Sequence, residues 1–326
     1  MQAYLRLPLG LVATALLIAP VHSAVLIPVV PVKNSTTTTV FGINDANIIA
    51  GSYIGSEDGV EHAFFGSLEG KYKSFDAGAG GTEARAINNN GFITGFSNSQ
   101  DGNTADQAMF ERWPHGKLVN IAVDGTQLFG QANGINNSRN AFAGTYWNFS
   151  LHQAVAFIGH RGRGKREVKI PAVHQASEGN GINSTGAVVG SFFRPPNEGY
   201  ILDNKTLTVV DYPSDTATGT TLEGINDTGE AVGQWVDSDG NTHSFVLDIA
   251  TSTFTDIAIE GATNVQAWSI NSAGAVAVSS DAGSFIWCAN ESACPAGGKA
   301  VAAPAHVSPK PFRHYAVTSG DEQHRH

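Results

Sequence analysis

The residues best suited to chemistry in this chain stand immediately before a recurring tripeptide, Gly/Ala/Ser-Ile-Asn. The tripeptide hardly varies, whereas the residue before it changes with every copy and reads Phe41, Arg85, Asn133, Asn180, Glu223 and Trp268. A guanidinium holds electron-rich oxygens, a carboxyl group transfers protons, amides form hydrogen bonds and aromatic rings pack against apolar surface. A second variable set lies two positions earlier: Thr39, Glu83, Gln131, Glu178, Thr221 and Gln266.

Linear catalytic signatures are missing from the sequence: it has no nucleophile elbow, zinc helix or phosphate loop. The run from Asp237 to Asn241 resembles the start of a calcium loop, but the later Glu ligand is missing. Asp-Gly pairs occupy the same place in other repeats, which favours a hairpin turn. We interpret His62, His152 and His243 as framework residues of the repeat, and expect no metal and no cofactor.

The elements that must position the variable residues follow from the repeat itself. Six copies of the tripeptide recur every 43 to 48 residues and end at Asn44, Asn88, Asn136, Asn183, Asn226 and Asn271. A period of this length is typical of propellers and solenoids. In four copies a Gly follows three residues after the Asn, at Gly91, Gly186, Gly229 and Gly274. Because Asn and Gly tolerate positive φ, each copy is predicted to form a tight turn.

Strands are predicted on both sides of each turn, because the flanking residues alternate or are β-branched. A second pair of strands follows in each repeat, for example residues 62–65 and 72–76 in the first. Four antiparallel strands make one blade, so the sequence predicts an all-β, six-bladed β-propeller. Alternation places both variable sets on one side of the innermost strands, at or near the central channel. Two interpretations stay open for them: a ligand site, or inter-blade packing and the lining of a water-filled channel.

The sixth repeat lacks a fourth strand, since a cysteine-bounded segment and an Ala/Pro-rich tail follow residues 283–287. An unpaired blade edge favours aggregation, so another segment is expected to fill the place. We predict that residues 25–32 close the last blade as an N-terminal strand, with residues 312–317 as the competitor. The predicted domain is a single propeller over residues 25–294, followed by a flexible C-terminal tail over residues 295–326.

The first 24 residues have the layout of a secretory signal peptide: Arg6, an apolar run from Leu7 to Ala19, and small residues at positions 23 and 24. The run is too short to cross a membrane. We therefore expect a soluble protein without membrane insertion, secreted or in the lumen of the secretory pathway. Cys288 and Cys294 are expected to form a disulfide there, worth about 2 kcal/mol in the chain-entropy model.

The formal net charge of −10 argues against nucleic acid as a partner, because that affinity comes from clustered cations. The one basic cluster, residues 161–166, is interpreted as a solvated loop. Sequons for N-glycosylation occur at Asn34, Asn136, Asn148, Asn183, Asn204, Asn226 and Asn290. In a eukaryotic host some of them would carry glycans.

The repeat pattern of Gly-Ile-Asn-x-x-Gly, a Val/Ile-Gly strand and then His-Ala-Phe resembles the extracellular repeat family named for its His-Ala-Phe (HAF) signature. The resemblance covers about residues 38 to 287. It implies the propeller fold but no particular activity. Three repeats depart from the signature and lack its His, at Gln107-Ala-Met-Phe, Gln153-Ala-Val-Ala-Phe and Glu198-Gly-Tyr-Ile.

In architecture the chain is also similar to the fungal hetero-Diels-Alderases of tropolone sesquiterpenoid biosynthesis, which are secreted-type six-bladed propellers. This similarity rests on fold, signal peptide and channel chemistry, and therefore on analogy. It implies a cofactor-free enzyme of secondary metabolism that joins two small-molecule substrates, a tropolone quinone methide and a humulene-type sesquiterpene, into a meroterpenoid. Arg85 and Glu223 would then be catalytic, Arg85 with Asn133 and Asn180 would bind the tropolone oxygens, and Phe41 with Trp268 would pack the terpene.

Two other functions stay open at this point. A non-catalytic binding module would hold a glycan or a surface partner, using exposed aromatic residues such as Trp147 and Trp235. Hydrolysis or lyase action on a polysaccharide would need converging carboxylates, for which Glu83, Glu178 and Glu223 are the channel candidates.

Overall fold

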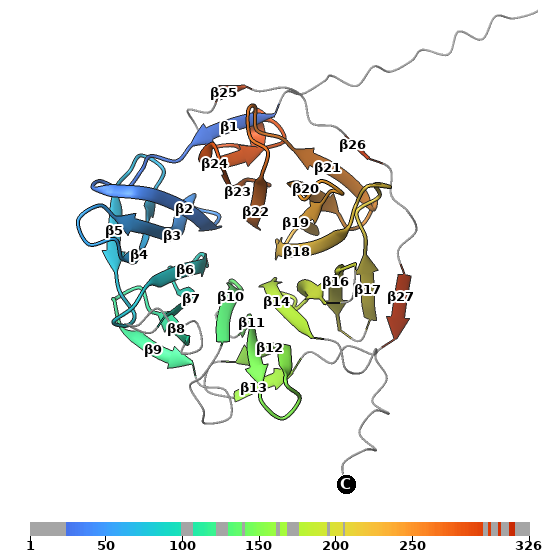
Figure 1. The fold of residues 1–326 in the computed structure, drawn as a ribbon, viewed down its shortest axis with the longest axis horizontal. Helices are drawn as coiled ribbons and strands as arrows, with labels where there is room; N and C mark the ends of the chain where they lie inside the picture. Colours follow the sequence, from blue (N-terminus) through green and yellow to red (C-terminus); the bar gives the residue numbers. More distant parts are fainter. Residues whose placement is uncertain are drawn as a thin grey trace, which may run out of the picture.

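Six sheets surround a central channel, and each sheet forms one blade (Figure 1). The computed structural model describes residues 24–98, 107–121, 130–138, 141–160, 164–167, 176–193, 196–204, 206–295, 299–300, 306–307 and 313–316. Neighbouring strands within every sheet are antiparallel. The predicted all-β, six-bladed propeller is confirmed.

Blades 1 to 5 each consist of four consecutive strands that run outward from the channel in chain order. Blade 1 contains β2 (Ser35–Ile43), β3 (Ile48–Gly55), β4 (Glu61–Ser67) and β5 (Tyr72–Phe75). Blade 2 contains β6 (Thr82–Ile87), β7 (Ile93–Ser97), β8 (Ala108–Arg112) and β9 (Leu118–Ile121), and blade 3 contains β10 (Gly130–Ile135), β11 (Ala141–Asn148), β12 (Gln153–His160) and β13 (Gly164–Glu167). Blade 4 contains β14 (Ser177–Ile182), β15 (Val188–Phe192), β16 (Glu198–Asp203) and β17 (Thr206–Val210), and blade 5 contains β18 (Gly219–Ile225), β19 (Glu230–Val236), β20 (Thr242–Asp248) and β21 (Thr253–Ile257).

Blade 6 is completed by the N-terminal end of the described chain. Its inner strands are β22 (Val265–Ile270), β23 (Val276–Ser280) and β24 (Gly283–Cys288), and β1 (Val25–Pro28) pairs antiparallel with β24. Val25 lies opposite Cys288, and Cys288 forms a disulfide with Cys294. Closure by the N-terminal strand and the Cys288–Cys294 disulfide are therefore confirmed.

The competing C-terminal segment lies elsewhere. β27 (Arg313–Ala316) pairs with β17 on the outside of blade 4, while β25 (Lys299–Ala300) and β26 (His306–Val307) pair with β1 and β21. These three segments are paired strands, which the prediction of a flexible tail did not include. The predicted signal peptide, residues 1–24, falls outside the described residues except for Ala24 and stays a prediction. Within the part of the chain that the structure describes, no helix is long and apolar enough to cross a membrane.

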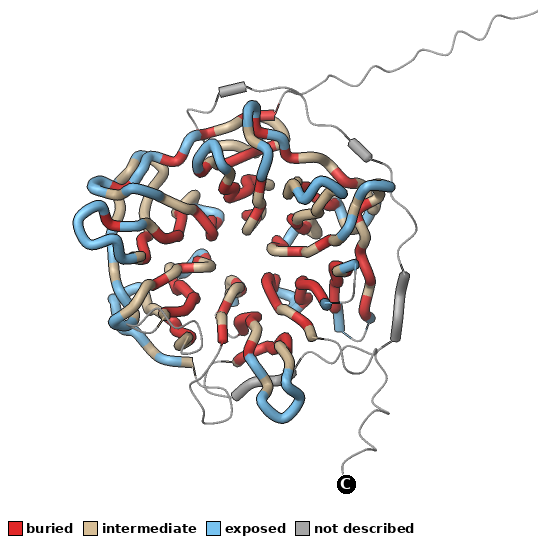
Figure 2. Tube along the Cα trace, viewed as in Figure 1, coloured by how far each residue is buried: buried red, intermediate tan, exposed pale blue. Residues whose placement is uncertain are grey.

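The hydrophobic core is divided among the blade interfaces rather than gathered at the centre. Each of the six clusters of buried residues joins two adjacent blades; the cluster between blades 6 and 1, for example, combines Val40 and Phe64 with Ala277 and Ile286. Buried segments accordingly follow the inner and middle strands, and exposed ones follow the outer turns (Figure 2). Packing therefore holds each blade to its neighbours.

A closed circle of hydrogen bonds links the six motif asparagines at one end of the channel. Each side-chain Nδ2 donates to the backbone carbonyl of the motif asparagine in the next blade, over 2.9 to 3.3 Å, in the order Asn44, Asn88, Asn136, Asn183, Asn226, Asn271 and back to Asn44. The small residue two positions before each Asn permits this approach, because a Cβ on Gly42 would lie only 3.1 Å from Cα of Ala86. We call this circle the asparagine ring.

The tight turns are present, but the motif asparagines do not supply their positive φ. Gly91, Gly186, Gly229 and Gly274 do so, and Asn47 takes the place of Gly in blade 1. The asparagine oxygen instead accepts hydrogen bonds from the turn, as Asn88 Oδ1 does from the amides of Asn90 and Phe92. The asparagine side chain thus satisfies the turn and the neighbouring blade at once.

The ring also corrects three of the predicted glycosylation sites. Asn136, Asn183 and Asn226 are buried, and each uses its Nδ2, the atom that would carry a glycan, in the ring. A glycan cannot occupy these atoms in the folded protein. Asn34 and Asn204 are exposed, whereas Asn148 and Asn290 are half-buried and accept hydrogen bonds from nearby amides. Glycosylation at these four sites stays a prediction.

Replacing one ring asparagine tests how much the ring stabilises the fold. Asn183→Ala removes the bond to Asn226 O and the acceptor for Ala187 N, and leaves both partners buried. We expect the free energy of unfolding in urea to fall by about 2 to 4 kcal/mol. The matched variant Ser184→Ala, at the exposed next position, is expected to change it by less than about 1 kcal/mol. Equal losses for the two variants would contradict a structural role of the ring.

Truncation at either end tests which strand closes the propeller. A chain ending at Cys294 keeps β1 on β24, and we expect it to retain its β-sheet circular dichroism and a cooperative thermal transition. Deleting residues 25–28 exposes the edge of β24, so that protein should associate or lose cooperativity. Size-exclusion chromatography and thermal melts measure both outcomes, and the reverse pattern would assign closure to the tail.

Candidate functional site in the central channel

The variable residue of each motif is the extra residue of a β-bulge. In all six innermost strands the pairing register with the second strand skips one residue, directly before the small residue of the tripeptide. The skipped residues are Phe41, Arg85, Asn133, Asn180, Glu223 and Trp268. A bulge leaves its residue outside the regular ladder and re-aims the side chain. The backbone thus presents six independent side chains to the channel.

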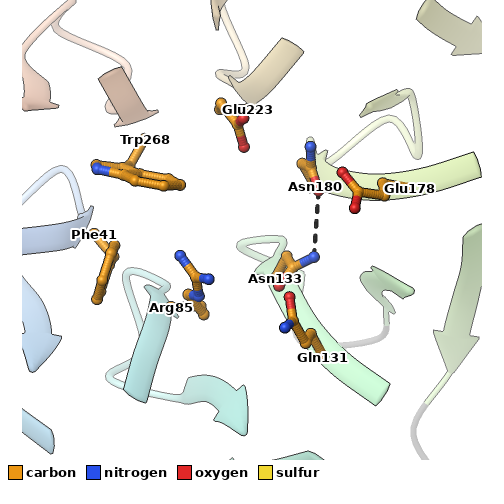
Figure 3. Close-up of a pocket in the computed structure, with 8 residues that line it drawn as sticks. All are labelled: Phe41, Arg85, Gln131, Asn133, Glu178, Asn180, Glu223 and Trp268. Atoms are coloured by element: carbon orange, nitrogen blue, oxygen red, sulfur yellow. Dashed lines mark hydrogen bonds between the residues drawn. The ribbon is translucent and has the colours of Figure 1, made fainter. Parts of the chain in front are cut away.

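These six side chains line one cavity at the end of the channel opposite the asparagine ring, together with Gln131 and Glu178 (Figure 3). Its volume is about 160 Å³, close to an engineered cavity of about 150 Å³ that holds benzene. The structure therefore brings together all six residues predicted as a site. Gln131 and Glu178 belong to the second variable set, which was predicted to lie at or near the channel but was not assigned to the substrate site.

The cavity has two chemically different sides. Phe41, Arg85 and Trp268 come from the adjacent blades 1, 2 and 6, whereas the amides and carboxyl groups come from blades 3, 4 and 5 (Figure 3). A ligand in the cavity would meet aromatic rings and a cation on one side, and hydrogen-bonding groups on the other.

Arg85 is held in an aromatic and anionic environment. Its Nε lies 3.1 Å from Oε2 of Glu83, and its Cζ lies 4.5 Å from the ring centroid of Phe41 and 5.2 Å from that of Trp268. Trp268 is fixed in turn, because its Nε1 donates to Ser279 Oγ over 2.7 Å. Arg85 Nε forms no hydrogen bond with a described residue, so cation–π contacts and the charge of Glu83 orient the guanidinium before any ligand binds.

The two asparagines of the site form a short chain of hydrogen bonds. Asn133 Nδ2 donates to Asn180 Oδ1 over 3.3 Å, and Asn180 Nδ2 donates to Leu222 O over 3.1 Å. Asn133 Oδ1 is buried and has no hydrogen-bond partner among the residues that the structure describes. An unpaired buried acceptor is costly, so this oxygen is available to a donor on a ligand or to a water molecule.

The carboxyl groups of Glu83, Glu178 and Glu223 all lie near enough to Arg85 to be affected by its charge. Burial raises the pKa of Glu223 to about 8, with a further increase from Glu178 and an opposing effect of Arg85. Burial likewise raises the pKa values of Glu83 and Glu178, although Arg85 lowers both. At neutral pH Glu223 is therefore predominantly protonated and able to donate a proton.

The rest of the channel is separated from this cavity by a belt of isoleucines. The Ile of each tripeptide lines the middle of the channel, below the bulge residues and above the asparagine ring: Ile43, Ile87, Ile135, Ile182, Ile225 and Ile270. Beyond it, Asp45 and Asp227 accept hydrogen bonds from Ser272 and Ser184. The six isoleucines thus form an apolar segment of the channel between the polar residues at its two ends.

His62 and His243 form contacts within the framework, whereas His152 is exposed in the turn before β12 and has a positive φ. His62 lies between Asp58 (3.0 Å) and Asp76 (2.8 Å), and His243 bonds to Asp237 over 2.8 Å. The run from Asp237 to Asn241 is a turn, because Asp237 Oδ1 accepts from the amides of Asp239 and Asn241. Among the described residues no group of three His, Cys, Asp or Glu side chains is placed to hold a metal ion.

The fold and the cavity define the chain as a six-bladed β-propeller with a polar pocket at one end of its channel. No protein-family model matches the sequence, and no curated protein does. Solved propellers are similar in structure. AofleA from Arthrobotrys oligospora has a TM-score of 0.47 and 7% identity over 90% of this chain and 93% of its own. The Aleuria aurantia lectin has a TM-score of 0.46 and 10% sequence identity, and the match covers 82% of this chain and 100% of the lectin. Virginiamycin B lyase from Staphylococcus aureus has a TM-score of 0.46 and 12% sequence identity, and the match covers 79% of this chain and 82% of the lyase. Likeness at this level concerns the fold alone.

The raised pKa of Glu223 predicts a pH-dependent cost to stability. Because the pKa of about 8 in the folded protein lies above the ordinary glutamate value of 4.5, the stability that this group contributes is complete below about pH 4.5 and is lost as the pH rises to about 8. Glu223→Gln cannot ionise. We expect it to be more stable than the parent protein at pH 9 by a few kcal/mol, with little difference at pH 4. Urea unfolding at both pH values measures this, and parallel stability curves would contradict it.

Proposed function

We propose that the channel-end cavity binds a small, oxygen-bearing molecule with a planar apolar part and that Glu223 transfers a proton to it. The observation that carries this proposal is the position of a protonated Glu223 across the cavity from Arg85 (Figure 3). An acid facing a fixed cation suits a reaction in which one oxygen leaves while another gains negative charge.

The reaction that fits best is the dehydration that starts a hetero-Diels–Alder addition. A hydroxymethyl tropolone would place its ring oxygens against Arg85 and its hydroxymethyl group against Glu223. The Glu223 carboxyl gives its proton to the leaving hydroxyl, the C–O bond breaks and water departs. The resulting carboxylate takes up the proton of the ring hydroxyl, so the product is the neutral quinone methide and Glu223 is again protonated.

The size of the cavity divides the two substrates between two places. About 160 Å³ accommodates a single ring with its oxygens, so a humulene-type alkene would lie at the cavity mouth, above Phe41 and Trp268. Asn133 and Asn180 would hold the tropolone oxygens in register with the alkene. Positioning two partners in this way lowers the barrier without covalent catalysis. The protein would then be a hetero-Diels-Alderase.

A non-catalytic binding module is the second candidate, and exposed aromatic residues favour it. On the β11–β12 hairpin, Trp147 is 41% exposed and Phe149 is 53% exposed. Trp235, the other aromatic residue suggested for this role, is stacked between Tyr212 and His243 at 4.5 and 4.3 Å. A glycan would therefore stack on Trp147 and be released without chemical change.

Incubation with a hydroxymethyl tropolone and humulene alcohol, followed by mass spectrometry, tests the proposed reaction. We expect a coupled product, formed at least about 100-fold more slowly by Glu223→Gln, and a rate that declines above about pH 8 as Glu223 ionises. Arg85→Ala and Trp268→Ala should also lose turnover, whereas Trp147→Ala should retain it. Folded Arg85→Ala and Trp268→Ala proteins with full turnover would overturn the assignment. Glycan binding that disappears only in Trp147→Ala would instead identify a binding module.

A further inference from the structure

A second cavity lies between blades 1 and 2, on the face that carries the asparagine turns. Its volume is about 560 Å³, more than three times that of the channel-end cavity, and within the range of small-molecule sites. Ile48, Phe65 and Ile87 form its apolar wall, and Lys71 with Lys73 stand beside them. We call it the lysine groove. It shares no lining residue with the channel-end cavity.

The two lysines are arranged to act on one ligand. They are two residues apart at the outer strand β5, so their side chains leave the same face of the sheet. Lys73 lies directly opposite Phe65 in the β4–β5 ladder, so the two side chains leave the same face of the sheet. The Phe65 ring itself carries the guanidinium of Arg112, whose Cζ lies 4.5 Å from the ring centroid. Both lysines are exposed, and neither forms a salt bridge with a described carboxylate. Glu69 lies near enough to Lys71 to be affected by its charge: the Ser67 hydroxyl, its own backbone amide and Lys71 lower the pKa of Glu69. The groove therefore keeps a net positive charge.

The propeller contains its own control for this groove. The corresponding groove between blades 5 and 6 has a volume of about 320 Å³ and is lined by Glu230, Asp248, Thr253 and Thr255. By strand register, Thr253 and Thr255 stand where blade 1 has Lys71 and Lys73, and Glu230 stands where blade 1 has Ile48. The repeat thus produces the groove in both places, and both grooves have apolar residues, since Val246 and Trp287 also line the groove between blades 5 and 6. The two described grooves differ in charge: lysines line the one in blade 1, and carboxylates with threonines line the other.

We propose that the lysine groove binds an amphipathic carboxylate, with the carboxylate on Lys71 and Lys73 and an alkyl or aryl body on Ile48, Phe65 and Ile87. The charge selects the ligand class, because this positive site stands on a protein whose formal net charge is −10. The apolar wall selects against small inorganic anions, which would gain nothing from it. This site shares no lining residue with the channel-end cavity and does not depend on the function proposed for that cavity.

Isothermal titration calorimetry with sodium laurate, kept below its micelle concentration, tests the proposal. We expect the parent protein to bind one laurate with an affinity that falls as salt is added. Lys71→Thr/Lys73→Thr, which installs the residues of the blade 5 groove, should weaken binding about tenfold. Ile48→Glu should weaken it further, because it introduces the carboxylate of the corresponding position.

Three comparisons identify the site and the class of ligand. Dodecyltrimethylammonium, which has the same chain length and opposite charge, and acetate, which lacks the chain, should not bind. Arg85→Ala should bind laurate like the parent protein. The proposal is overturned if laurate does not bind, if the double lysine variant binds it unchanged, or if Arg85→Ala is the variant that loses it. Thermal melts verify that each variant is folded.

Discussion

Six asparagine side chains set the geometry on which the rest of the propeller depends. In each inner hairpin the asparagine oxygen accepts from the turn, and the nitrogen donates to the backbone of the next blade. Because the sixth bond returns to Asn44, the blades cannot shift relative to one another without breaking a buried hydrogen bond. The same bonds fix how closely the innermost strands approach, which is why a Gly, Ala or Ser stands two positions before every asparagine.

This constraint leaves the neighbouring residue free. The β-bulge belongs to the backbone of every innermost strand, so it directs a side chain toward the channel whatever that side chain is. Stability is therefore assigned to the asparagines, the isoleucines and the inter-blade clusters, while the bulge residues can vary. In this chain the bulge residues place the Arg85 guanidinium between two aromatic rings on one side of the cavity. On the other side they place amides and a protonatable carboxyl group.

The repeat was sufficient to predict the blades, the closing strand and the residues of the candidate site, because comparison among copies separates constant positions from variable ones. It was not sufficient to predict the bulge, since skipping one residue is a property of pairing with a second strand. The role of the asparagines was also missed: their spacing predicted a turn, but a bond to a residue more than 40 positions away has no local signal. Gln131 and Glu178 were in the second variable set, yet only the curvature of the ring decides which members of that set reach the cavity. The pairing of residues 313–316 with blade 4 likewise depends on long-range contacts.

The pairing of β1 with β24 sets an order of events during synthesis. Val25 is synthesised before the other strands of the propeller and must wait for Cys288 before it finds its partner. Blades 1 to 5 each contain their own hairpins and can form as they emerge, but the circle cannot be completed before β24 has been synthesised. The disulfide next to this junction forms last as well, because Cys294 follows Cys288. A nascent chain with five blades would therefore expose the inter-blade surfaces of blades 1 and 5, and a chaperone would be needed most at that stage.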